Sequence, residues 1–305
     1  MLAIVIPYYK ISFFEETLQS LACQTDQRFK VYIGDDASSQ NPINILEKYS
    51  GKFDFVYHRF DSNLGKDSLI EQWERCLALS IDEEWIMILG DDDILGNNVV
   101  ESFYNQYKEF NELSNVVRFA SVVLNEQNNT LSKKYEHPRL EKGLDFFIRK
   151  LKWETRSSLS EYFFKREVYL KHHFIQYPSG FYSDDRAWID FTEDKPIYSI
   201  NESVITIRIS DSSLSGTADQ DVLKKAEYLY LKYFYENKLS SLQKKDRFFV
   251  LKKIEFYYFS HNVNFNSWFY LYAKYWTNFD FREMYRFHKM LFLRVLEGRS
   301  KKNRR

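Results

Sequence analysis

Residues 85–95 read Trp-Ile-Met-Ile-Leu-Gly-Asp-Asp-Asp-Ile-Leu. An apolar run that ends directly on charged residues is typical of a buried β-strand. In an open α/β sheet, ligands bind where the strands end at their carboxyl side. Because adjacent carboxylates repel one another, Asp91, Asp92 and Asp93 indicate a site that a cation neutralises, with an acidic solvated turn as the alternative. An EF-hand loop is excluded, because its last position would be Ser102 where such a loop needs Glu.

The chain before this stretch alternates between short apolar runs and amphipathic segments. Their β-α-β-α-β-α-β rhythm, with connections of a few residues, predicts a mostly parallel sheet flanked by helices. No Gly-x-Gly-x-x-Gly or Walker-type sequence follows the first run, which argues against a dinucleotide dehydrogenase and a P-loop enzyme. A sugar nucleotidyltransferase would also need a glycine-rich loop there. The expected strands are 2–7, 29–33, 53–58 and 85–89, and the expected helices are 13–22, 42–49 and 68–79.

The chain after residue 95 continues with mixed elements and a further acidic pair. Asp184 and Asp185 stand at the start of a helical pattern. Residues 125–156 are expected to form loops that set substrate specificity. The other expected elements are helices 97–110 and 166–172 and strands 116–124, 160–164 and 196–209.

The composition describes an ordered protein with two differently charged parts. Its 305 residues include 27 Phe and 23 Tyr, which makes extensive disorder implausible. Two cysteines without zinc or disulfide spacing fit a reducing cytoplasm. We find neither a signal-peptide pattern at the start nor a run of 18 apolar residues. Residues 221–305 hold 19 basic and 8 acidic residues, so the neutral chain combines an acidic body with a basic, aromatic tail.

Three acidic pairs at the ends of elements suggest nucleotide-sugar chemistry. The alternation brings three strand ends to one edge, where Asp35 and Asp36 would face Asp91 and Asp92 across a cleft. Carboxylates can accept from a uracil imide, hold ribose hydroxyls or bind a divalent metal that neutralises a leaving diphosphate. Another carboxylate can act as general base for an acceptor hydroxyl. Each pair taken alone could instead be a helix N-cap or a solvated turn.

On these residues, the chain from residue 2 to about 215 resembles a family 2 glycosyltransferase with the GT-A fold. The resemblance is to the type that builds bacterial surface polysaccharides such as capsule or lipopolysaccharide. One departure is Gly90, which stands where the family often has the first aspartate of Asp-x-Asp-Asp. The matching stretches are Ile4-Val5-Ile6-Pro7-Tyr8-Tyr9, Ile33-Gly34-Asp35-Asp36-Ala37-Ser38, Asn63-Leu64-Gly65, Gly90-Asp91-Asp92-Asp93 and Ser183-Asp184-Asp185.

The resemblance implies a role for each stretch. Asp185 would be the base, with Asp184 beside it. Asp92 and Asp93 would hold Mn²⁺ or Mg²⁺, although the departure at Gly90 leaves open which of the three adjacent aspartates does so. Arg208 with the serines after it resembles a loop that closes over the donor, or else is a polar linker. The nucleotide-binding residues would be Pro7, Tyr8, Tyr9, Asp35, Asp36, Asn63, Gly65 and Asp91.

The implied function is inverting, metal-dependent sugar transfer. The donor would be a nucleotide sugar, with UDP as the expected nucleotide, and the moved group a hexosyl or N-acetylhexosaminyl unit. The acceptor would be a hydroxyl of a glycan or a lipid-linked glycan. A non-catalytic sugar- or lipid-binding module on the same fold is the alternative.

We expect a catalytic domain over 1–218 and a helical region over 219–305. Within the first, residues 1–95 would bind the nucleotide sugar and residues 96–218 the acceptor. The tail has two apolar stripes at helical spacing with cations beside them, which suits an anionic membrane surface, a second subunit or the catalytic domain itself. It carries no nucleic-acid recognition motif. A cytoplasmic location, peripheral on the inner face of the membrane, would follow. The stripes are Phe248, Leu251, Ile254 and Tyr258, then Met284, Phe287, Leu291 and Val295.

Overall fold

The computed structural model describes residues 2–211, 219–238, 241–260 and 265–302, with side chains left out for 265 and 294–302. Ser212, Ser213 and Ser215, expected in a loop over the donor, lie outside the described residues. The chain divides into two compact units, residues 1–226 and 227–305. The expected boundary at 218/219 stays a prediction.

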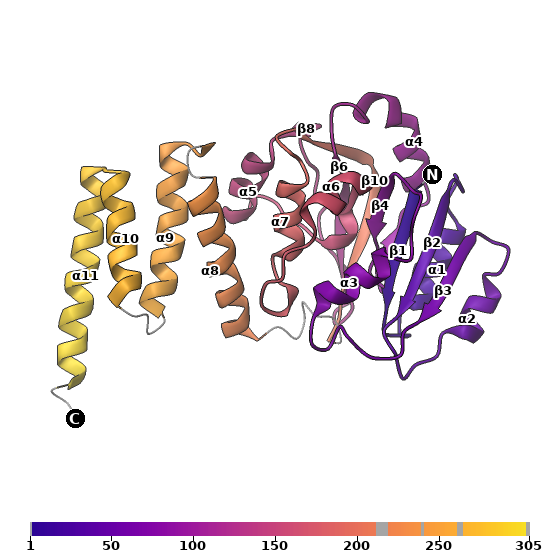
Figure 1. Ribbon diagram of the computed structural model, residues 1–305, viewed down its shortest axis with the longest axis horizontal. Coiled ribbons are helices and arrows are strands. Elements are labelled where there is room, and N and C mark those ends of the chain that lie inside the picture. Colours follow the sequence, from indigo (N-terminus) through magenta and orange to yellow (C-terminus); the bar gives the residue numbers. More distant parts are fainter. Residues whose placement is uncertain (1, 212–218, 239–240, 261–264, 303–305) are drawn as a thin grey trace. The chain divides into compact units, whose positions relative to one another are not determined.

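The N-terminal half of the first unit has the alternation that the sequence predicts (Figure 1). Strand β1 lies between β2 and β4 and pairs in parallel with both, and β3 extends the sheet beyond β2. The carboxyl ends of β1, β2 and β4 therefore share one edge, as expected. The elements are β1 (Leu2–Tyr8), α1 (Phe14–Ala22), β2 (Phe29–Asp35), α2 (Ile43–Lys48), β3 (Asp54–Arg59), α3 (Leu69–Leu77) and β4 (Trp85–Ile88).

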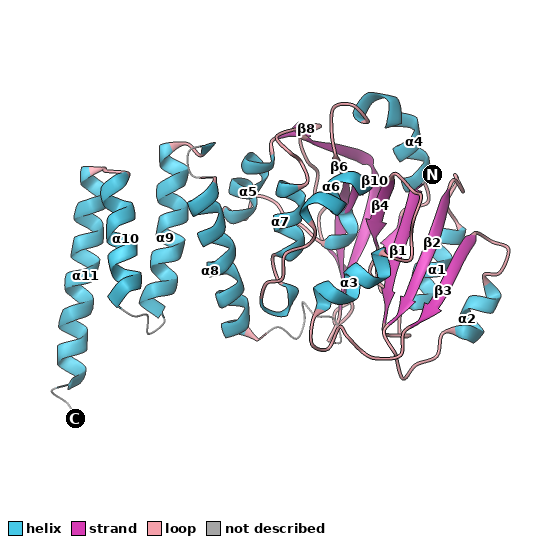
Figure 2. Cartoon of the chain, in the orientation of Figure 1, coloured by secondary structure: helices cyan, strands magenta, loops and turns pink. Residues whose placement is uncertain are grey.

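The following residues extend this sheet in mixed orientation (Figure 2). Strand β9 is antiparallel to both β4 and β6, whereas β10 runs parallel to β6. The strand order is β3-β2-β1-β4-β9-β6-β10-β5. The elements are β5 (Ile94–Leu95), α4 (Val99–Phe110), β6 (Val116–Asn125), β7 (Thr130–Leu131), β8 (Leu140–Glu141), α5 (Gly143–Leu151), β9 (Tyr162–Lys165), α6 (Arg166–His172), α7 (Ser183–Asp190) and β10 (Ile197–Ile209), with 3₁₀ turns at Leu159–Glu161 and Pro178–Gly180.

Helix α5 corrects the expectation that residues 125–156 are loops. Its sequence places Phe147, Ile148 and Leu151 at helical spacing, and these side chains are buried. The polar stretch before it hides that pattern. Because α5 packs against α7, it becomes part of the frame that holds the Asp184–Asp185 pair.

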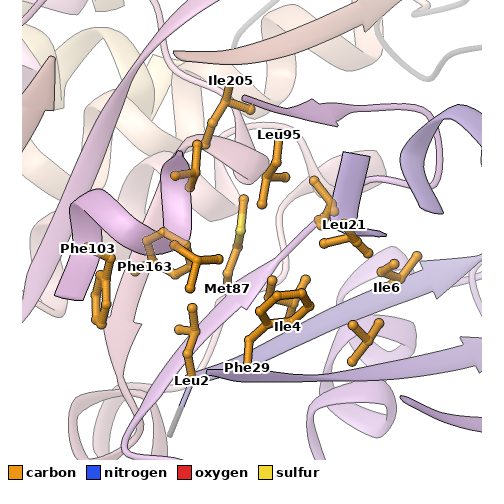
Figure 3. Packing of buried hydrophobic residues seen from close by; sticks show 14 of the residues in the cluster. Leu2, Ile4, Ile6, Leu21, Phe29, Met87, Leu95, Phe103, Phe163 and Ile205 are labelled. Carbon is orange, nitrogen blue, oxygen red and sulfur yellow. The ribbon is translucent and has the colours of Figure 1, made fainter. Parts of the chain in front are cut away.

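Successive side chains along β1 point to opposite faces of the sheet, and apolar side chains are buried on both faces. Leu2, Ile4 and Ile6 of β1 point into one cluster, with Phe29, Met87 and Phe103 among its members (Figure 3). Ala3 and Val5 on the opposite face are also fully buried. Burial on both faces is the pattern of a central parallel strand, and it fixes the strand ends that carry the site.

The second unit is helical. Members of both expected apolar stripes pack inside this unit: Phe248 lies against Tyr275, and Tyr275 stacks on Phe287 with ring centroids 4.4 Å apart. The side chain of Val295 lies outside the described residues. Among the described residues, no helix is long and apolar enough to cross a membrane. The helices are α8 (Gln220–Asn237), which begins in the first unit, α9 (Lys244–Ser260), α10 (Phe265–Thr277) and α11 (Phe281–Lys302).

Candidate active site

A cleft of about 630 Å³ opens at the carboxyl ends of β1, β2 and β4. Aspartates from two of the expected acidic stretches line it, together with two lysines that suit a diphosphate. Its lining includes Pro7, Tyr8, Tyr9, Lys10, Asp36, Asn63, Gly65, Lys66, Gly90, Asp91, Asp92, Asp93, Ser158, Ile207 and Arg208.

Asp91 is tied to the end of β1. Its Oδ2 accepts the backbone N–H groups of Tyr9 and Lys10, at 2.7 and 2.8 Å. Burial raises the pKa of Asp91 to about 6, although these hydrogen bonds favour the charged form. Asp91 thus fixes the turn that shapes the β1 side of the cleft.

Asp93 is held from two other elements. Its carboxylate accepts the Ser160 hydroxyl at 2.5 Å and the backbone N–H of Arg208 at 2.9 Å. Burial, with the neighbouring Asp92 charge, raises the pKa of Asp93 to about 7. Asp93 therefore joins the acidic loop to β10 and to the turn before β9.

Of the three aspartates, Asp92 has the carboxylate with the fewest hydrogen bonds. Its carboxylate accepts no hydrogen bond from another of the described residues, whereas its carbonyl accepts the Arg208 Nε at 2.9 Å. No group of three metal-ligating side chains occurs within the described ranges. Magnesium is commonly held by one or two carboxylates together with substrate phosphates, so Asp92 fits a metal that binds with a nucleotide diphosphate.

Gly90 leaves room for this arrangement. A Cβ at residue 90 would lie 2.9 Å from Asp93 Oδ2 and 3.1 Å from Asp92 Oδ1. Its N–H donates to Ser160 Oγ, the same hydroxyl that binds Asp93. The departure from the family pattern is thus coupled to the placement of the two aspartates that follow.

Tyr8 and Tyr9 differ in their exposure. The Tyr8 ring is buried against Phe14, and its hydroxyl donates to the carbonyl of Gln40 at 2.6 Å. Tyr9 is 44% exposed at the cleft and offers a ring on which a base can stack. Pro7 pairs with Gly34 in the sheet and also lines the cleft.

Asp36 lines the cleft, and Asp35 does not. Asp35 is fully buried and accepts from Tyr57, Arg59 and the Ser38 N–H. Tyr57 and Arg59 of β3 bind its Oδ2, and the Ser38 N–H after β2 binds its Oδ1, so both oxygens are occupied. Asp35 therefore stands behind the site, contrary to the expectation that both carboxylates face the cleft.

Asp36 binds the loop that carries Asn63 and Gly65. Its oxygens accept the N–H groups of Leu64 and Gly65 at 2.7 and 2.9 Å and pair with Arg75 of α3. A Cβ at residue 65 would lie 2.6 Å from Asp36 Oδ2. Close approach of the loop backbone to Asp36 requires glycine at this position.

We predict that Gly65→Ala weakens nucleotide binding. The added methyl group must displace Asp36 and break its hydrogen bond to the residue 65 N–H, at a cost of about 1 kcal/mol in stability. Calorimetry with UDP measures the affinity, and urea unfolding measures the stability. Asp61→Ala, an exposed change in the same loop, serves as control. Unchanged UDP affinity in Gly65→Ala would show that this loop does not touch the nucleotide.

The Asp184–Asp185 pair opens α7 but does not line the cleft described above. Asp185 is only 4% exposed and forms an ion pair with Lys150 of α5. Its other oxygen, Oδ1, is buried and has no hydrogen-bond partner in the described part of the chain. An acceptor hydroxyl that donates a hydrogen bond to Oδ1 would supply the partner that this buried oxygen lacks.

Asp184 gives a prediction with a defined pH dependence. Burial and the neighbouring Asp185 charge raise the pKa of Asp184 from 3.8 to about 7. Between these values the folded state keeps a proton that the unfolded state releases, so stability is lost as the pH rises from about 4 to 7.

We therefore expect Asp184→Asn to stabilise the fold more at about pH 8 than at about pH 5, with a difference between the two gains of at most about 3 kcal/mol. Urea unfolding at both pH values measures the two gains. The same gain at both would mean that ionisation of Asp184 carries no cost in the folded state.

The Arg208 side chain connects several elements of this site. The side chain is buried, stacks 4.1 Å above the Phe13 ring, and pairs with Glu16 at 2.6 Å and with Glu126. It joins α1, β10 and the acidic loop. The predicted loop over the donor would begin after this fixed residue.

No local sequence pattern indicates which residues hold the aspartates. Arg75 is one cation on an amphipathic helix, Ser160 precedes a short strand, and Lys150 lies in the helix that was expected to be loop. Each acts on an aspartate distant in the chain. Only the spatial pairing of these elements identifies them.

The sequence of the chain matches a known protein family. The family described as Glycosyl transferase family 2 matches residues 3–179, which is more than half of the chain. No curated protein is significantly similar to it in sequence.

The chain also resembles solved structures of S. aureus TarS. The crystal structure of TarS 1-349 in complex with UDP-GlcNAc has a TM-score of 0.63 at 14% identity, and the alignment covers 92% of this chain and 82% of that one. The complex with UDP gives 0.59 at 14% identity, with 92% and 82% covered. The crystal structure titled S. aureus TarS gives 0.60 at 15% identity, with 92% and 50% covered. At these identities the likeness shows a shared fold.

Proposed function

Because this chain belongs to glycosyl transferase family 2, we propose that it transfers a sugar from a UDP-sugar to a hydroxyl of a glycan or lipid-linked acceptor. The moved group would be a hexosyl or N-acetylhexosaminyl unit, and the reaction would invert the anomeric carbon. The product would belong to a surface polysaccharide. The fold shared with TarS, whose structures contain UDP-GlcNAc and UDP, supports the choice of nucleotide.

The observation that carries this proposal is the state of Asp92. Both oxygens of Asp93 and the Oδ2 of Asp91 accept hydrogen bonds within the protein, while the whole Asp92 carboxylate is available in the cleft. Lys10 and Lys66 line the same cleft. One open carboxylate and two cations suit a diphosphate that brings a divalent metal with it.

The metal, Mn²⁺ or Mg²⁺, would be held by Asp92 and would supply Lewis-acid neutralisation of the leaving diphosphate. The protein's own residues do the remaining work. Asp91 orients the backbone at Tyr9 and Lys10, and Asp36 fixes the Asn63–Gly65 loop. These contacts preorganise the cleft for the nucleotide.

For the acceptor we propose Asp185 as the general base. Inversion needs a base on the face of the sugar opposite the leaving group. Asp185 Oδ1 has no hydrogen-bond partner among the described residues, and Lys150 fixes the other oxygen. An oxygen in this state can take the proton of an acceptor hydroxyl.

Both cysteines are free, Cys76 buried and Cys23 exposed, which agrees with the proposed cytoplasmic location.

A donor screen tests the proposal. Binding and hydrolysis of a panel of nucleotide sugars are measured with manganese and with EDTA. We expect manganese to strengthen binding of one UDP-sugar and slow metal-dependent hydrolysis of the same compound. Sugar binding that is the same with and without manganese and with and without the nucleotide, and that is not followed by hydrolysis, would instead identify a non-catalytic binding module.

A further inference from the structure

The α10–α11 hairpin exposes a set of large aromatic side chains. In α10 they lie at positions 269, 272 and 276, and in α11 at 281, 285 and 292, so each set follows one side of its helix. We call this set the aromatic face. Its members and exposed fractions are Phe269 (65%), Tyr272 (38%), Trp276 (61%), Phe279 (55%), Phe281 (76%), Tyr285 (67%) and Phe292 (64%).

Ring contacts join the two helices into one surface. Tyr272 lies edge-on to His288 of α11 with ring centroids 5.7 Å apart, and Trp276 lies 6.0 Å from Phe279 in the connecting turn. The aromatic face is therefore continuous across the hairpin.

The aromatic face takes no part in the packing inside the second unit and stays exposed. The inward side of the hairpin already buries Leu271, Tyr275, Met284 and Phe287. Exposed apolar surface of this extent usually marks a binding surface.

The charges around the face are positive. Arg282 and Lys289 are exposed on α11, and neither has an ion pair within the described part of the chain. The sequence continues with one acid, Glu297, and six further cations, Arg294, Arg299, Lys301, Lys302, Arg304 and Arg305.

The neighbouring acidic residues are already paired. Glu283 pairs with Lys252 and Arg286, and Asp280 pairs with Lys244. Lys253 of α9 pairs with Glu227, so three of the five cations of this helix are held in ion pairs, whereas Arg282 and Lys289 of α11 are not paired among the described residues.

We propose that the aromatic face docks on an anionic membrane surface. Tyr and Trp with adjacent Lys and Arg match the water–lipid boundary, where rings enter the headgroup region and cations meet anionic lipid. A second copy of the chain is disfavoured, because a twofold contact over this face would bring Arg282 and Lys289 close to the cations of the other copy, and Asp280 and Glu283, the described acids beside them, are already paired. This inference stands apart from the chemistry of the cleft.

Vesicle co-sedimentation of the full chain tests the proposal. Wild type should bind phosphatidylcholine vesicles that contain phosphatidylglycerol, bind phosphatidylcholine alone far less, and lose binding with salt. Arg282→Gln with Lys289→Gln should weaken binding to the anionic vesicles about 30-fold, which corresponds to about 1 kcal/mol for each cation. Trp276→Ser with Tyr285→Ser should weaken binding to both kinds of vesicle.

Control variants in the first unit, together with measurements of self-association and thermal stability, separate membrane binding from its alternatives. Lys108→Gln and Ile81→Ser, exposed in the first unit, should leave vesicle binding unchanged. Donor hydrolysis should be the same in every variant. Self-association that Trp276→Ser with Tyr285→Ser abolishes, without vesicle binding, would overturn the proposal in favour of a second copy. A marked loss of thermal stability in that variant, without vesicle binding, would overturn it in favour of internal packing.

Discussion

Replacing Asp185 with Asn should lower sugar transfer by about 10²–10⁴-fold, the usual contribution of a general base. The amide keeps the shape of the side chain but cannot take the proton of the acceptor hydroxyl. Because Asp185 lies outside the cleft that carries Asp92, UDP and manganese affinities should stay near wild type. Single-turnover transfer and calorimetry with UDP measure the two effects separately.

A matched variant on the same helix controls for structural damage. Asp190 pairs with Arg186 four residues earlier on α7, so Asp190→Asn removes a carboxylate from this helix without touching Lys150 or Asp185. Transfer by this variant should remain within a few-fold of wild type. If Asp185→Asn loses UDP affinity and keeps its turnover, the base lies elsewhere and Asp185 belongs to the donor site.

Replacing Asp92 with Asn should abolish metal-dependent transfer. Removing this charge removes the stabilisation of the leaving diphosphate, which is worth several kcal/mol, or about 10³-fold or more. The fold should persist, because no hydrogen bond of another described residue depends on this carboxylate. Manganese-dependent UDP binding, followed by calorimetry, should fall together with transfer.

Asp82→Asn, an exposed change before β4, is the control for overall charge and should bind UDP and manganese as wild type does. Near wild-type turnover of Asp92→Asn in saturating manganese would remove Asp92 from the metal site. Asp93 would be a poor replacement, because Ser160 and Arg208 already occupy its oxygens.

The part of the fold around the nucleotide cleft follows from local pattern. Strand β1 is apolar at every position from Leu2 to Ile6, and the next three strand–helix units repeat that rhythm within one or two residues of the expected bounds. Connections of a few residues then permit few topologies. The antiparallel insertion of β9 between β4 and β6 was not predictable, since a four-residue strand carries no information about its partner.

The acidic stretches were predictable as a group, but the state of each carboxylate was not. Asp35 and Asp36 are adjacent, yet Tyr57 and Arg59 of β3 hold one while Arg75 and the Leu64–Gly65 backbone hold the other. Adjacent strand residues point to opposite faces, and only the paired elements decide which face meets the ligand. The same holds for Asp185, whose partner Lys150 comes from helix α5, in a range where the polar sequence predicts loops.

The most direct test of the account is a crystal structure with UDP and manganese, in which anomalous scattering locates the metal. We predict a manganese peak bonded to the Asp92 carboxylate and to the diphosphate, with the Asp91 and Asp93 hydrogen bonds to Tyr9, Lys10, Ser160 and Arg208 unchanged. A peak coordinated by Asp93, or UDP bound in the cleft of manganese-soaked crystals with no metal beside it, would contradict the account.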